Sequence, residues 1–458
     1  MAVSALAGDS STDPTIVTLK EAIKARLPSR LQLAAHLLAE HAKDPLQEIT
    51  VESVLNGMRG LPCVLWEVSD VGVDGVKYHG KTLDEIDATL PKWPGSSQLS
   101  PEAVLWFLYT ATAPSQSLLQ DFSAALLRRS ELPEDVKRLC DGLPRDIAPM
   151  SQMVMCATRL SDHSRFSAAL ARGVPKRDMW VHAFEDSLDV AVRVPMLVAR
   201  IHANIARNGE DRDMPLDYSQ DIAQNFASRM GKTDPEFVEL VRAYWSLHMD
   251  HGANVSSHVM RICSSAWTDA YSTIAAGLIG GTGTLHAGAI VRAVQFTLAM
   301  SSSLGPDPTD EAIAAHVQAI VKNGINLPGY GHAVLRDVDP RLRFIRKFLV
   351  NAHLDTVDKS RTSLLQLVSR TDSIVPDLLQ KLVPQLKNPA PNVDALSGCL
   401  LYSYGIDVDF LLPVIVCSRG MGFMAQYTWD RALSLPIERP LSVTMEQIVA
   451  LIERRKGE

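Results

Sequence analysis

The segment Gly329-Tyr-Gly-His332-Ala-Val-Leu-Arg-Asp-Val-Asp-Pro-Arg341 joins a glycine turn, a histidine and an arginine nine residues after the histidine. A glycine turn lets the backbone come close to a ligand, and a histidine can hold or donate a proton near neutral pH. An arginine can bind a carboxylate through two parallel hydrogen bonds. The segment therefore indicates a site that binds an anion and moves a proton.

Five other segments add residue types that this one lacks. Two add histidines, one adds a carboxylate and two add arginines. They are Leu247-His-Met-Asp-His251-Gly-Ala-Asn254-Val-Ser256, Gly283-Thr-Leu-His286-Ala-Gly288, Pro391-Asn-Val-Asp394-Ala-Leu-Ser-Gly398, Cys417-Ser-Arg419-Gly420 and Glu438-Arg439-Pro440. Together the six segments predict one acid–base site.

The chain of 458 residues has an ordinary globular composition, 46% hydrophobic and 21% charged. Its net charge of −7 argues against nucleic acid as a partner, because phosphate binding needs a concentrated basic surface. The six cysteines have no Cys-x-x-Cys spacing and predict reduced thiols of an intracellular protein. The N-terminal segment MAVSALAGDSSTDPT has no arginine, unlike a mitochondrial presequence. We expect a cytoplasmic protein, or a mitochondrial one if a presequence has been removed.

Helical periodicity dominates the chain, and strand-like alternation is scarce. Apolar residues recur at helical spacing between Leu31 and Glu40. Pro101 directly after Ser100 is a helix start signal, and the segment 444–455 has an early acid and late arginines, as the helix dipole prefers. The segment 71–78 is the best candidate for a small hairpin. The sequence predicts a mainly α fold.

In this order and at these spacings, the six segments closely resemble citrate synthase in its eukaryotic form. The resemblance extends roughly from residue 17 to the C-terminus. Further matching segments are Val51-Glu-Ser-Val-Leu-Asn-Gly-Met-Arg-Gly60, Pro149-Met-Ser-Gln-Met153, Glu185-Asp-Ser-Leu-Asp189 and Arg431-Ala-Leu-Ser-Leu-Pro-Ile-Glu-Arg-Pro440. The resemblance implies a homodimer of the citrate synthase fold. Each subunit would have a large helical domain (1–287 and 405–458) and a smaller inserted helical domain (288–404).

The chemistry that the resemblance implies begins with a base. Joining the α-carbon of a thioester to a ketone needs a base for the α-proton, a donor to the enolate oxygen and a donor to the ketone. Asp394 is the only candidate base among the segments, although alone it could be a helix N-cap or a turn residue. By resemblance His286 stabilises the enol and His332 donates to the ketone of oxaloacetate. Alone, a histidine among small residues such as His286 is more often structural.

The resemblance also implies a site for the two carboxylates of oxaloacetate. His251, Arg341, Arg419 and Arg439 would hold them, and a dianion suits this set of cations. Arg439 would reach into the site of the neighbouring subunit. Any single arginine could instead form a surface ion pair.

Supporting residues are expected around these groups. Ser256 would orient a catalytic histidine, with Asn254 beside it. Lys176 could equally be a solvated surface charge. The residues predicted to bind CoA are Leu327, Gly329, Arg336, Lys387 and Lys176.

Departures from the family pattern gather near the acyl group. Four residues after His286, where the family usually has Asn, this chain has Ile290. Leu396 stands where the family usually has a polar or aromatic residue, and Ile415 stands where it commonly has a phenylalanine. Each methylene buried in such an aliphatic pocket contributes about 0.8 kcal/mol. The sequence therefore predicts an acyltransferase that converts the acyl group into alkyl on transfer and uses a longer acyl-CoA. Such enzymes are the alkylcitrate synthases of fungal secondary metabolism.

Alternatives remain beside this prediction. The protein could be a citrate or 2-methylcitrate synthase of primary metabolism, or a catalytically silent dimeric scaffold. His248-x-x-His251 with Asp250 could suggest a metal site, but no third ligand is apparent and the family needs no metal. Gly281-Thr-Gly283 follows no strand, which disfavours a dinucleotide loop. The uncharged stretch 270–291 is interrupted by Gly, Ser, Thr and His, which disfavours a membrane span. We expect no metal, and no cofactor besides the CoA thioester substrate.

Overall fold

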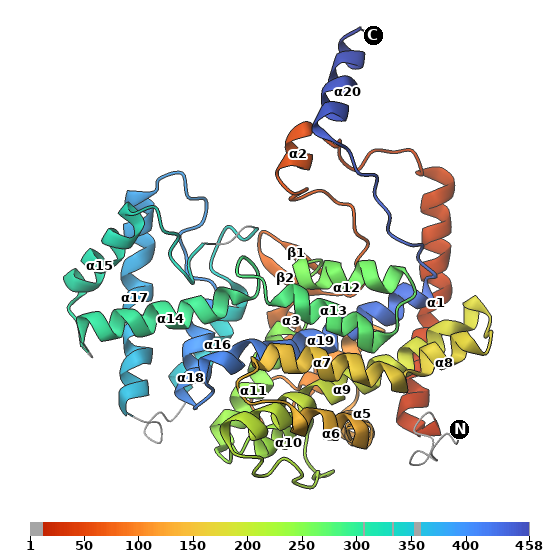
Figure 1. The fold of residues 1–458 in the computed structure, drawn as a ribbon, viewed down its shortest axis with the longest axis horizontal. Coiled ribbons are helices and arrows are strands. Elements are labelled where there is room, and N and C mark those ends of the chain that lie inside the picture. Colours follow the sequence, from red (N-terminus) through yellow and green to blue (C-terminus); the bar gives the residue numbers. More distant parts are fainter. Residues whose placement is uncertain (1–11, 306, 332–333, 352–358, 458) are drawn as a thin grey trace.

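The structure, a computed structural model, describes residues 12–305, 307–331, 334–351 and 359–457, and helices make up most of it (Figure 1). The first helices are α1 (Pro14–Glu40), α2 (Val51–Leu55), α3 (Leu83–Thr89), α4 (Pro101–Thr110), α5 (Gln116–Leu127), α6 (Glu134–Gly142), α7 (Pro149–Leu160), α8 (Arg165–Ala171), α9 (Met179–Ala206) and α10 (Ile222–Arg229). They are followed by α11 (Pro235–His248), α12 (Val255–Ser265), α13 (Ala270–Gly281), α14 (Gly288–Leu304), α15 (Asp310–Lys322), α16 (Pro340–Asn351), α17 (Lys359–Leu382), α18 (Asp394–Ser403), α19 (Val408–Ala432) and α20 (Met445–Gly457). Two short 3₁₀ turns, η2 (Ser161–His163) and η3 (Lys176–Asp178), complete the helical elements.

One small antiparallel sheet accompanies these helices in the described residues. Its strands β1 (Ser69–Gly72), β2 (Gly75–Tyr78) and β3 (Lys81–Thr82) pair in sequence order. The predicted hairpin is therefore confirmed. The predicted helix start is also confirmed: the Ser100 hydroxyl accepts a hydrogen bond from the backbone N–H of Ala103, and Pro101 occupies the first turn.

Helices α9 and α19 form the centre of the molecule, where they pack along each other. Among the described residues, α19 is the one helix long and apolar enough to cross a membrane, and most of it is buried inside the protein. The uncharged stretch 270–291 is not one helix, because α13 ends at Gly281 and a turn precedes α14.

Arg129 forms a buried ion-pair cluster with α9 beside this centre. Its Nε donates to Asp189 at 2.7 Å and its Nη2 lies 2.9 Å from a carboxylate oxygen of Glu185. The Arg129 side chain is 0% exposed and both carboxylates are 4% exposed. This cluster gives a structural reason for the acidic segment 185–189.

We expect Arg129→Met to lower the free energy of unfolding by about 3–5 kcal/mol, because removing one partner of a buried pair leaves uncompensated charge. Arg128→Met is the matched control: Arg128 pairs with Asp13 but is 50% exposed, so its loss should cost less than about 1 kcal/mol. Urea unfolding at fixed protein concentration measures both. Equal losses for the two variants would contradict the assignment of a buried cluster.

Helices α14 to α18 gather on one side of the molecule (left in Figure 1). A second, smaller core of Val317, Leu327, Val375 and Leu379 lies among them, and the main core also reaches α14 and α18. The start of α14 at Gly288 and the end of α18 at Ser403 fall within the predicted insert. The exact domain boundaries stay a prediction.

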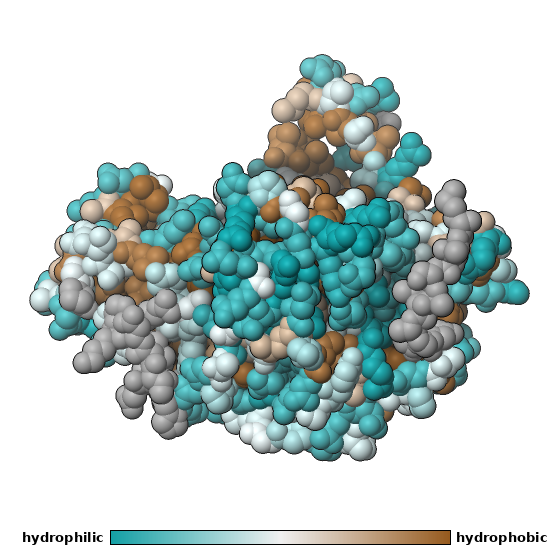
Figure 2. All heavy atoms as spheres, turned by 60° about the horizontal axis from the view of Figure 1, so that its bottom comes forward, coloured by the Kyte–Doolittle hydropathy of each residue, from teal (hydrophilic) through white to brown (hydrophobic). Residues whose placement is uncertain are grey.

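The N- and C-terminal regions expose many apolar side chains. Helices α2 and α20 project from the body at the top of Figure 1, and the projection in Figure 2 carries a brown apolar surface. Exposed apolar residues of these regions are Leu31, Leu33, Leu37, Leu38, Leu46, Ile49, Val51, Leu55, Ile437, Leu441, Met445, Val449 and Leu451.

Candidate active site

A cavity of about 240 Å³ lies where α12, α13, α14, α16, α18 and α19 meet. It brings together most of the predicted catalytic, oxaloacetate and acyl residues. Those that line it are His251, Asn254, Ser256, His286, Ile290, Arg341, Asp394, Ile415 and Arg419. His332 lies outside the described residues.

Asp394 is the first residue of α18, and the N-cap position belongs to Val393. The N-cap alternative for Asp394 is therefore wrong. Burial raises the pKa of the Asp394 carboxyl above its ordinary value, although the nearby Arg341 guanidinium opposes that rise. A carboxylate with a raised pKa inside a cavity suits a general base.

The glycine turn packs directly behind this helix start. Gly329 has a φ of +82°, and a Cβ there would lie 2.9 Å from the Cα of Ala395. Only glycine combines this backbone conformation with this close approach. Gly329 was predicted to bind CoA; the structure places it against α18, where it fixes the position of the chain.

Asn392 ties the glycine turn to α18 through both ends of its amide. Its Nδ2 donates to the carbonyl oxygen of Gly331 at 3.1 Å, and its Oδ1 accepts from the backbone N–H of Asp394 at 3.0 Å. The residue preceding His332 is thus held at a fixed distance from the start of the helix that carries Asp394.

His286 receives two hydrogen bonds from Ser256. The backbone N–H of Ser256 lies 3.2 Å from Nε2 of His286, and the Ser256 hydroxyl lies 2.9 Å from the same atom. Because a backbone N–H can only donate, Nε2 accepts, so the neutral ring carries its proton on Nδ1. Burial lowers the pKa of His286, and the charge of Arg419 lowers it further. His286 is therefore a neutral hydrogen-bond donor, held by Ser256 as predicted.

Three glycines of α13 face helix α12, which carries Ser256. A Cβ on Gly280 would lie 3.6 Å from the Cα of Ser256, and a Cβ on Gly281 would lie 3.4 Å from its hydroxyl oxygen. Gly277, one turn earlier, faces Met260 of the same helix α12. Because these glycines lie at i, i+3 and i+4, they share one face of α13 and let α12 pack closely against it.

The pKa shifts of Asp394 and His286 predict the pH dependence of activity. Asp394 must be ionised to accept a proton, and its pKa lies above the ordinary 3.8; His286 must be neutral to donate, and its pKa lies below the ordinary 6.5. We expect kcat/KM to fall on the acid side with an apparent pKa above 3.8. We expect no loss from His286 at neutral pH. A pH profile with saturating oxaloacetate measures this, and an acid limb at or below 3.8 would contradict it.

Two buried arginines provide the positive charge of the cavity. Arg341 is bound by Asp339 through Nε at 3.1 Å and Nη2 at 2.7 Å, so its charge is compensated. Burial raises the pKa of Asp339, but Arg341 outweighs it and lowers the pKa to about 2. Arg419 has a buried Nη1 without a hydrogen-bond partner among the described residues. Burial lowers the pKa of Arg419, and the charge of Arg341 lowers it further. The pair therefore offers a site for an anion.

His248 also lines this cavity, and the sequence did not assign it a role there. Its Nδ1 lies 2.8 Å from the carbonyl oxygen of Tyr244, which can only accept, so Nδ1 carries the proton. Its buried Nε2 has no hydrogen-bond partner among the described residues. Burial lowers the pKa of His248 well below its ordinary value, as do Arg341 and Arg419. The i, i+3 spacing to His251 was the signal that could have placed it at the cavity.

Asp250 holds the turn that carries His251. Its carboxylate accepts from the indole N–H of Trp66 at 3.0 Å, from the backbone N–H of Gly252 at 2.9 Å and from the Ser69 hydroxyl. These contacts occupy the carboxylate that a metal at His248-x-x-His251 would need. In the described part of the chain, no three His, Cys, Asp or Glu side chains are grouped so that they could hold a metal ion.

The structure corrects the predicted acyl pocket. Leu396 is 1% exposed and lies in the main core, and it does not line the cavity. Ile290 and Ile415 do line it. The apolar wall also contains residues for which the sequence predicted no role in the pocket: Met260, Ile274, Gly277, Leu278, Ala287, Ala289, Val393, Leu412 and Val416.

The predicted CoA residues are outside the cavity lining. Arg336 and Lys387 are exposed on neighbouring loops, which Asn388 joins by donating to the carbonyl oxygens of Leu335 at 3.1 Å and Asp337 at 3.0 Å. Two cations on adjacent loops suit the phosphates of CoA.

Leu327 and Lys176 lie in different surroundings. The Leu327 side chain is buried in the second core, and the predicted contact of Leu327 with CoA stays a prediction. Lys176 is exposed on η3, where its Nζ lies 5.4 Å from the ring centroid of Trp267.

Arg439 is not among the residues that line the cavity of its own chain. It is exposed on the segment after α19. The preceding Glu438 is fixed to the body, because its backbone N–H donates to the Ser265 hydroxyl at 3.0 Å and its carboxylate pairs with Arg261 at 3.0 Å. The segment therefore leaves the body directly before Arg439.

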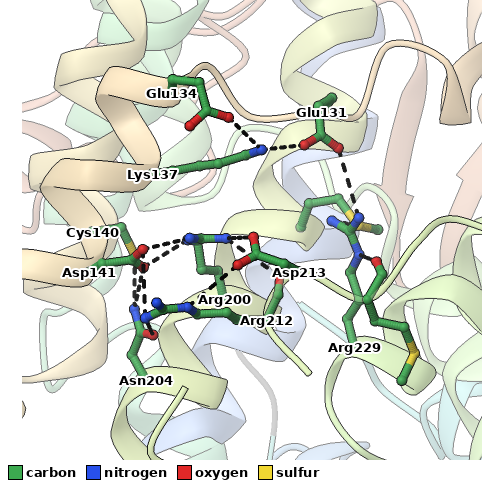
Figure 3. A network of polar contacts seen from close by, with 12 residues as sticks. Glu131, Glu134, Lys137, Cys140, Asp141, Arg200, Asn204, Arg212, Asp213 and Arg229 are labelled. Carbon is green, nitrogen blue, oxygen red and sulfur yellow. Dashed lines mark hydrogen bonds and ion pairs between the residues drawn. The ribbon is translucent and has the colours of Figure 1, made fainter. Parts of the chain in front are cut away.

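A second cavity of about 220 Å³ lies beside α6, α9 and α10 and contains a polar network (Figure 3). Its central residue, Arg200, binds Asp141 at 2.6 Å and Asp213 at 2.8 Å. Lys137 pairs with Glu131 and Glu134 on one side of it. The network joins α6 and α9 to the loop after α9. Since its cations are paired with carboxylates, it leaves little uncompensated charge for a ligand.

A family model described as the C-terminal domain of citrate synthase matches residues 57–441. The peroxisomal citrate synthase of Saccharomyces cerevisiae is 37% identical over 439 residues, which cover 95% of this chain and 94% of that protein. The mitochondrial 2-methylcitrate synthase of Fusarium solani is 35% identical over 453 residues, covering 97% of this chain and 94% of that protein.

Solved structures show the same fold. Citrate synthase from Pyrobaculum aerophilum superposes with a TM-score of 0.73 at 22% identity, covering 85% of this chain and 92% of that one. A ternary complex of carboxymethyl coenzyme A and oxaloacetate with the Thermoplasma acidophilum citrate synthase superposes with a TM-score of 0.67 at 18% identity, covering 87% of this chain and 96% of that one. At these identities the structural likeness concerns the fold alone.

Proposed function

Because this chain belongs to the citrate synthase family, an enzyme family that condenses an acyl-CoA with oxaloacetate, we propose that its acyl-CoA is longer than acetyl-CoA and its product an alkylcitrate. The observation that carries this proposal is the apolar wall of the cavity beside Asp394 and His286. The proposed reaction needs no metal and no cofactor besides the CoA thioester.

In the proposed first step, Asp394 removes a proton from the α-carbon of the acyl-CoA, and Nδ1–H of His286 hydrogen-bonds to the thioester oxygen as negative charge develops there. The α-carbon then attacks the ketone carbon of oxaloacetate, forming the new carbon–carbon bond. His332 would give its proton to the ketone oxygen, which becomes a hydroxyl. Water then cleaves the thioester and releases CoA and the tricarboxylate.

The charges around the cavity support oxaloacetate as the second substrate. Arg419 has a buried donor without a partner among the described residues, and Arg341 lies close enough to lower its pKa. A carboxylate bound between the two would remove the repulsion between them. We propose that His251 and Arg439 of a second subunit help to hold the dianion.

The proposed homodimer rests on the exposed segment around Arg439. Ile437 and Leu441 flank Arg439 and are 59% and 90% exposed. Apolar side chains at such exposure on a projecting segment favour burial against another surface. Together with the exposed apolar residues of α1 and α2, they support a second copy of this chain as that surface.

The relatives favour a second candidate function. Both citrate synthases and 2-methylcitrate synthases match along nearly the whole chain, so acetyl-CoA or propionyl-CoA could be the preferred substrate. The named relatives are peroxisomal or mitochondrial, and a cytoplasmic location stays a prediction. Release of CoA in the presence of oxaloacetate would exclude the silent scaffold.

A panel of acyl-CoAs with oxaloacetate, with the products identified by mass, tests the proposed substrate. We expect a higher kcat/KM for a chain of roughly four to ten carbons than for acetyl-CoA, because each buried methylene contributes about 0.8 kcal/mol. We expect Ile415→Phe to shift the preference back toward acetyl-CoA, since the ring would fill the wall of the cavity. If acetyl-CoA surpasses every longer thioester in the wild type, the protein is an ordinary citrate synthase with a repacked pocket.

A further inference from the structure

Part of the cavity lining is apolar and comes from α12 and α13. The polar part of the same lining includes Asp394, His286 and the two arginines Arg341 and Arg419. Ile274 and Leu278 of α13 continue the lining, and Met260 of α12 and Gly277 of α13 meet within it. The cavity therefore offers polar groups for the reacting atoms and an apolar lining formed by α12 and α13, which we call the apolar arm.

Within this arm, the side chain of Met260 packs directly against Gly277. A Cβ added to Gly277 would clash with Cγ of Met260 and would lie 2.5 Å from its Sδ atom, separations at which one of the two groups has to move. Met260 is 3% exposed, so its side chain is enclosed by protein and by the cavity. The missing side chain at position 277 is what lets the Met260 thioether lie against α13.

We propose that the acyl tail enters this arm and that Met260, packed against Gly277, sets the greatest tail length that the site accepts. The proposal rests on the proposed function, since it assigns the tail of the same acyl-CoA. The α-carbon must lie between the Asp394 carboxylate and His286, and both residues line the same cavity as Met260. A tail that leaves the α-carbon could then pack against the apolar residues of the arm.

The chemistry of methionine suits this role. Its unbranched side chain has three rotatable bonds and fills irregular gaps, so it can adjust to tails of different length. It also has no hydrogen-bonding group that an apolar tail would leave unsatisfied. The value of kcat/KM should therefore fall gradually beyond the greatest tail length, and that length should change with single substitutions at positions 260 and 277.

The two positions allow opposite substitutions. Met260→Ala removes the three heavy atoms beyond Cβ and lengthens the arm. Gly277→Ala keeps methionine at position 260 but adds a methyl group that clashes with its Cγ and Sδ, and so pushes the thioether into the arm. Because the clashing atoms belong to a flexible side chain and not to the backbone, we expect the Gly277→Ala protein to fold.

The experiment measures kcat/KM for acyl-CoAs of even chain length from two to about twelve carbons, each with saturating oxaloacetate. For every variant the values are divided by its own acetyl-CoA value, so that a loss common to all substrates cancels. Met260→Ala should raise the ratio for the longest substrates by at least about tenfold, and Gly277→Ala should lower it, on a scale of about fourfold per methylene. Ile262→Ala, on the same helix but 44% exposed, is the matched control and should leave the ratios unchanged.

The outcomes separate this inference from the proposed function. A wild type that prefers acetyl-CoA contradicts the proposed function, yet opposite shifts of the ratios in the two variants would still support the tail path. Ratios that stay at wild-type values in both Met260→Ala and Gly277→Ala overturn the inference, whichever substrate the wild type prefers. If Met260→Ala does not fold, Gly277→Ala decides alone: a lowered ratio supports the inference and an unchanged ratio overturns it.

Discussion

Asp394→Asn should lower kcat by at least about a hundredfold, the scale on which loss of a general base acts. The amide has nearly the shape of the carboxylate but cannot accept a proton in the reaction. The backbone N–H of Asp394 keeps its bond to Asn392, because that bond does not involve the substituted side chain. The fold and the affinity for oxaloacetate should therefore change little.

The same substitution should not lower stability. Burial raises the pKa of Asp394, which means that the folded protein disfavours the charged form, and asparagine carries no charge. Turnover, oxaloacetate binding by calorimetry and urea unfolding together test the role of Asp394. Asp377→Asn, at an exposed position on α17, is the control and should retain full activity. Near-normal turnover of Asp394→Asn would exclude Asp394 as the base.

The geometry of helices explains which acyl residues the sequence could place. Ile415 and Arg419 are four residues apart on α19, so they lie on one face, and both line the cavity. Leu396 follows Asp394 by two residues on α18, which turns it by about 200° to the opposite face. Its closeness in sequence to the predicted base therefore pointed to the wrong side of the helix.

Other parts of the site depend on contacts between distant segments. Asp250 is fixed by Trp66 and Ser69, which lie more than 180 residues earlier in the chain. A short motif gives no information about such partners, so Asp250 could be considered only as a metal ligand. The contact between Ser256 and His286 was predictable because the resemblance supplied both segments together.

One residue of the predicted site can be tested only in the assembled protein. Arg439 is exposed in its own chain and does not line the cavity there, as expected if it serves a neighbouring subunit. Arg439→Ala alone should be almost inactive, because the oxaloacetate dianion would lose one of its cations. This loss alone would not show which subunit's site Arg439 completes, so a mixing experiment is required.

Mixing the almost inactive variants Arg439→Ala and Asp394→Asn should restore activity. In a heterodimer, the subunit with intact Asp394 receives Arg439 from its partner, so one of the two sites is complete. Random exchange at equal amounts makes about half of the dimers heterodimers, and roughly a quarter of wild-type activity should return. Mixing Asp394→Asn with Arg419→Ala is the matched control and should restore nothing, because both residues line the cavity of their own chain. If exchange is demonstrated with labelled subunits and the first mixture stays inactive, Arg439 does not act across the dimer.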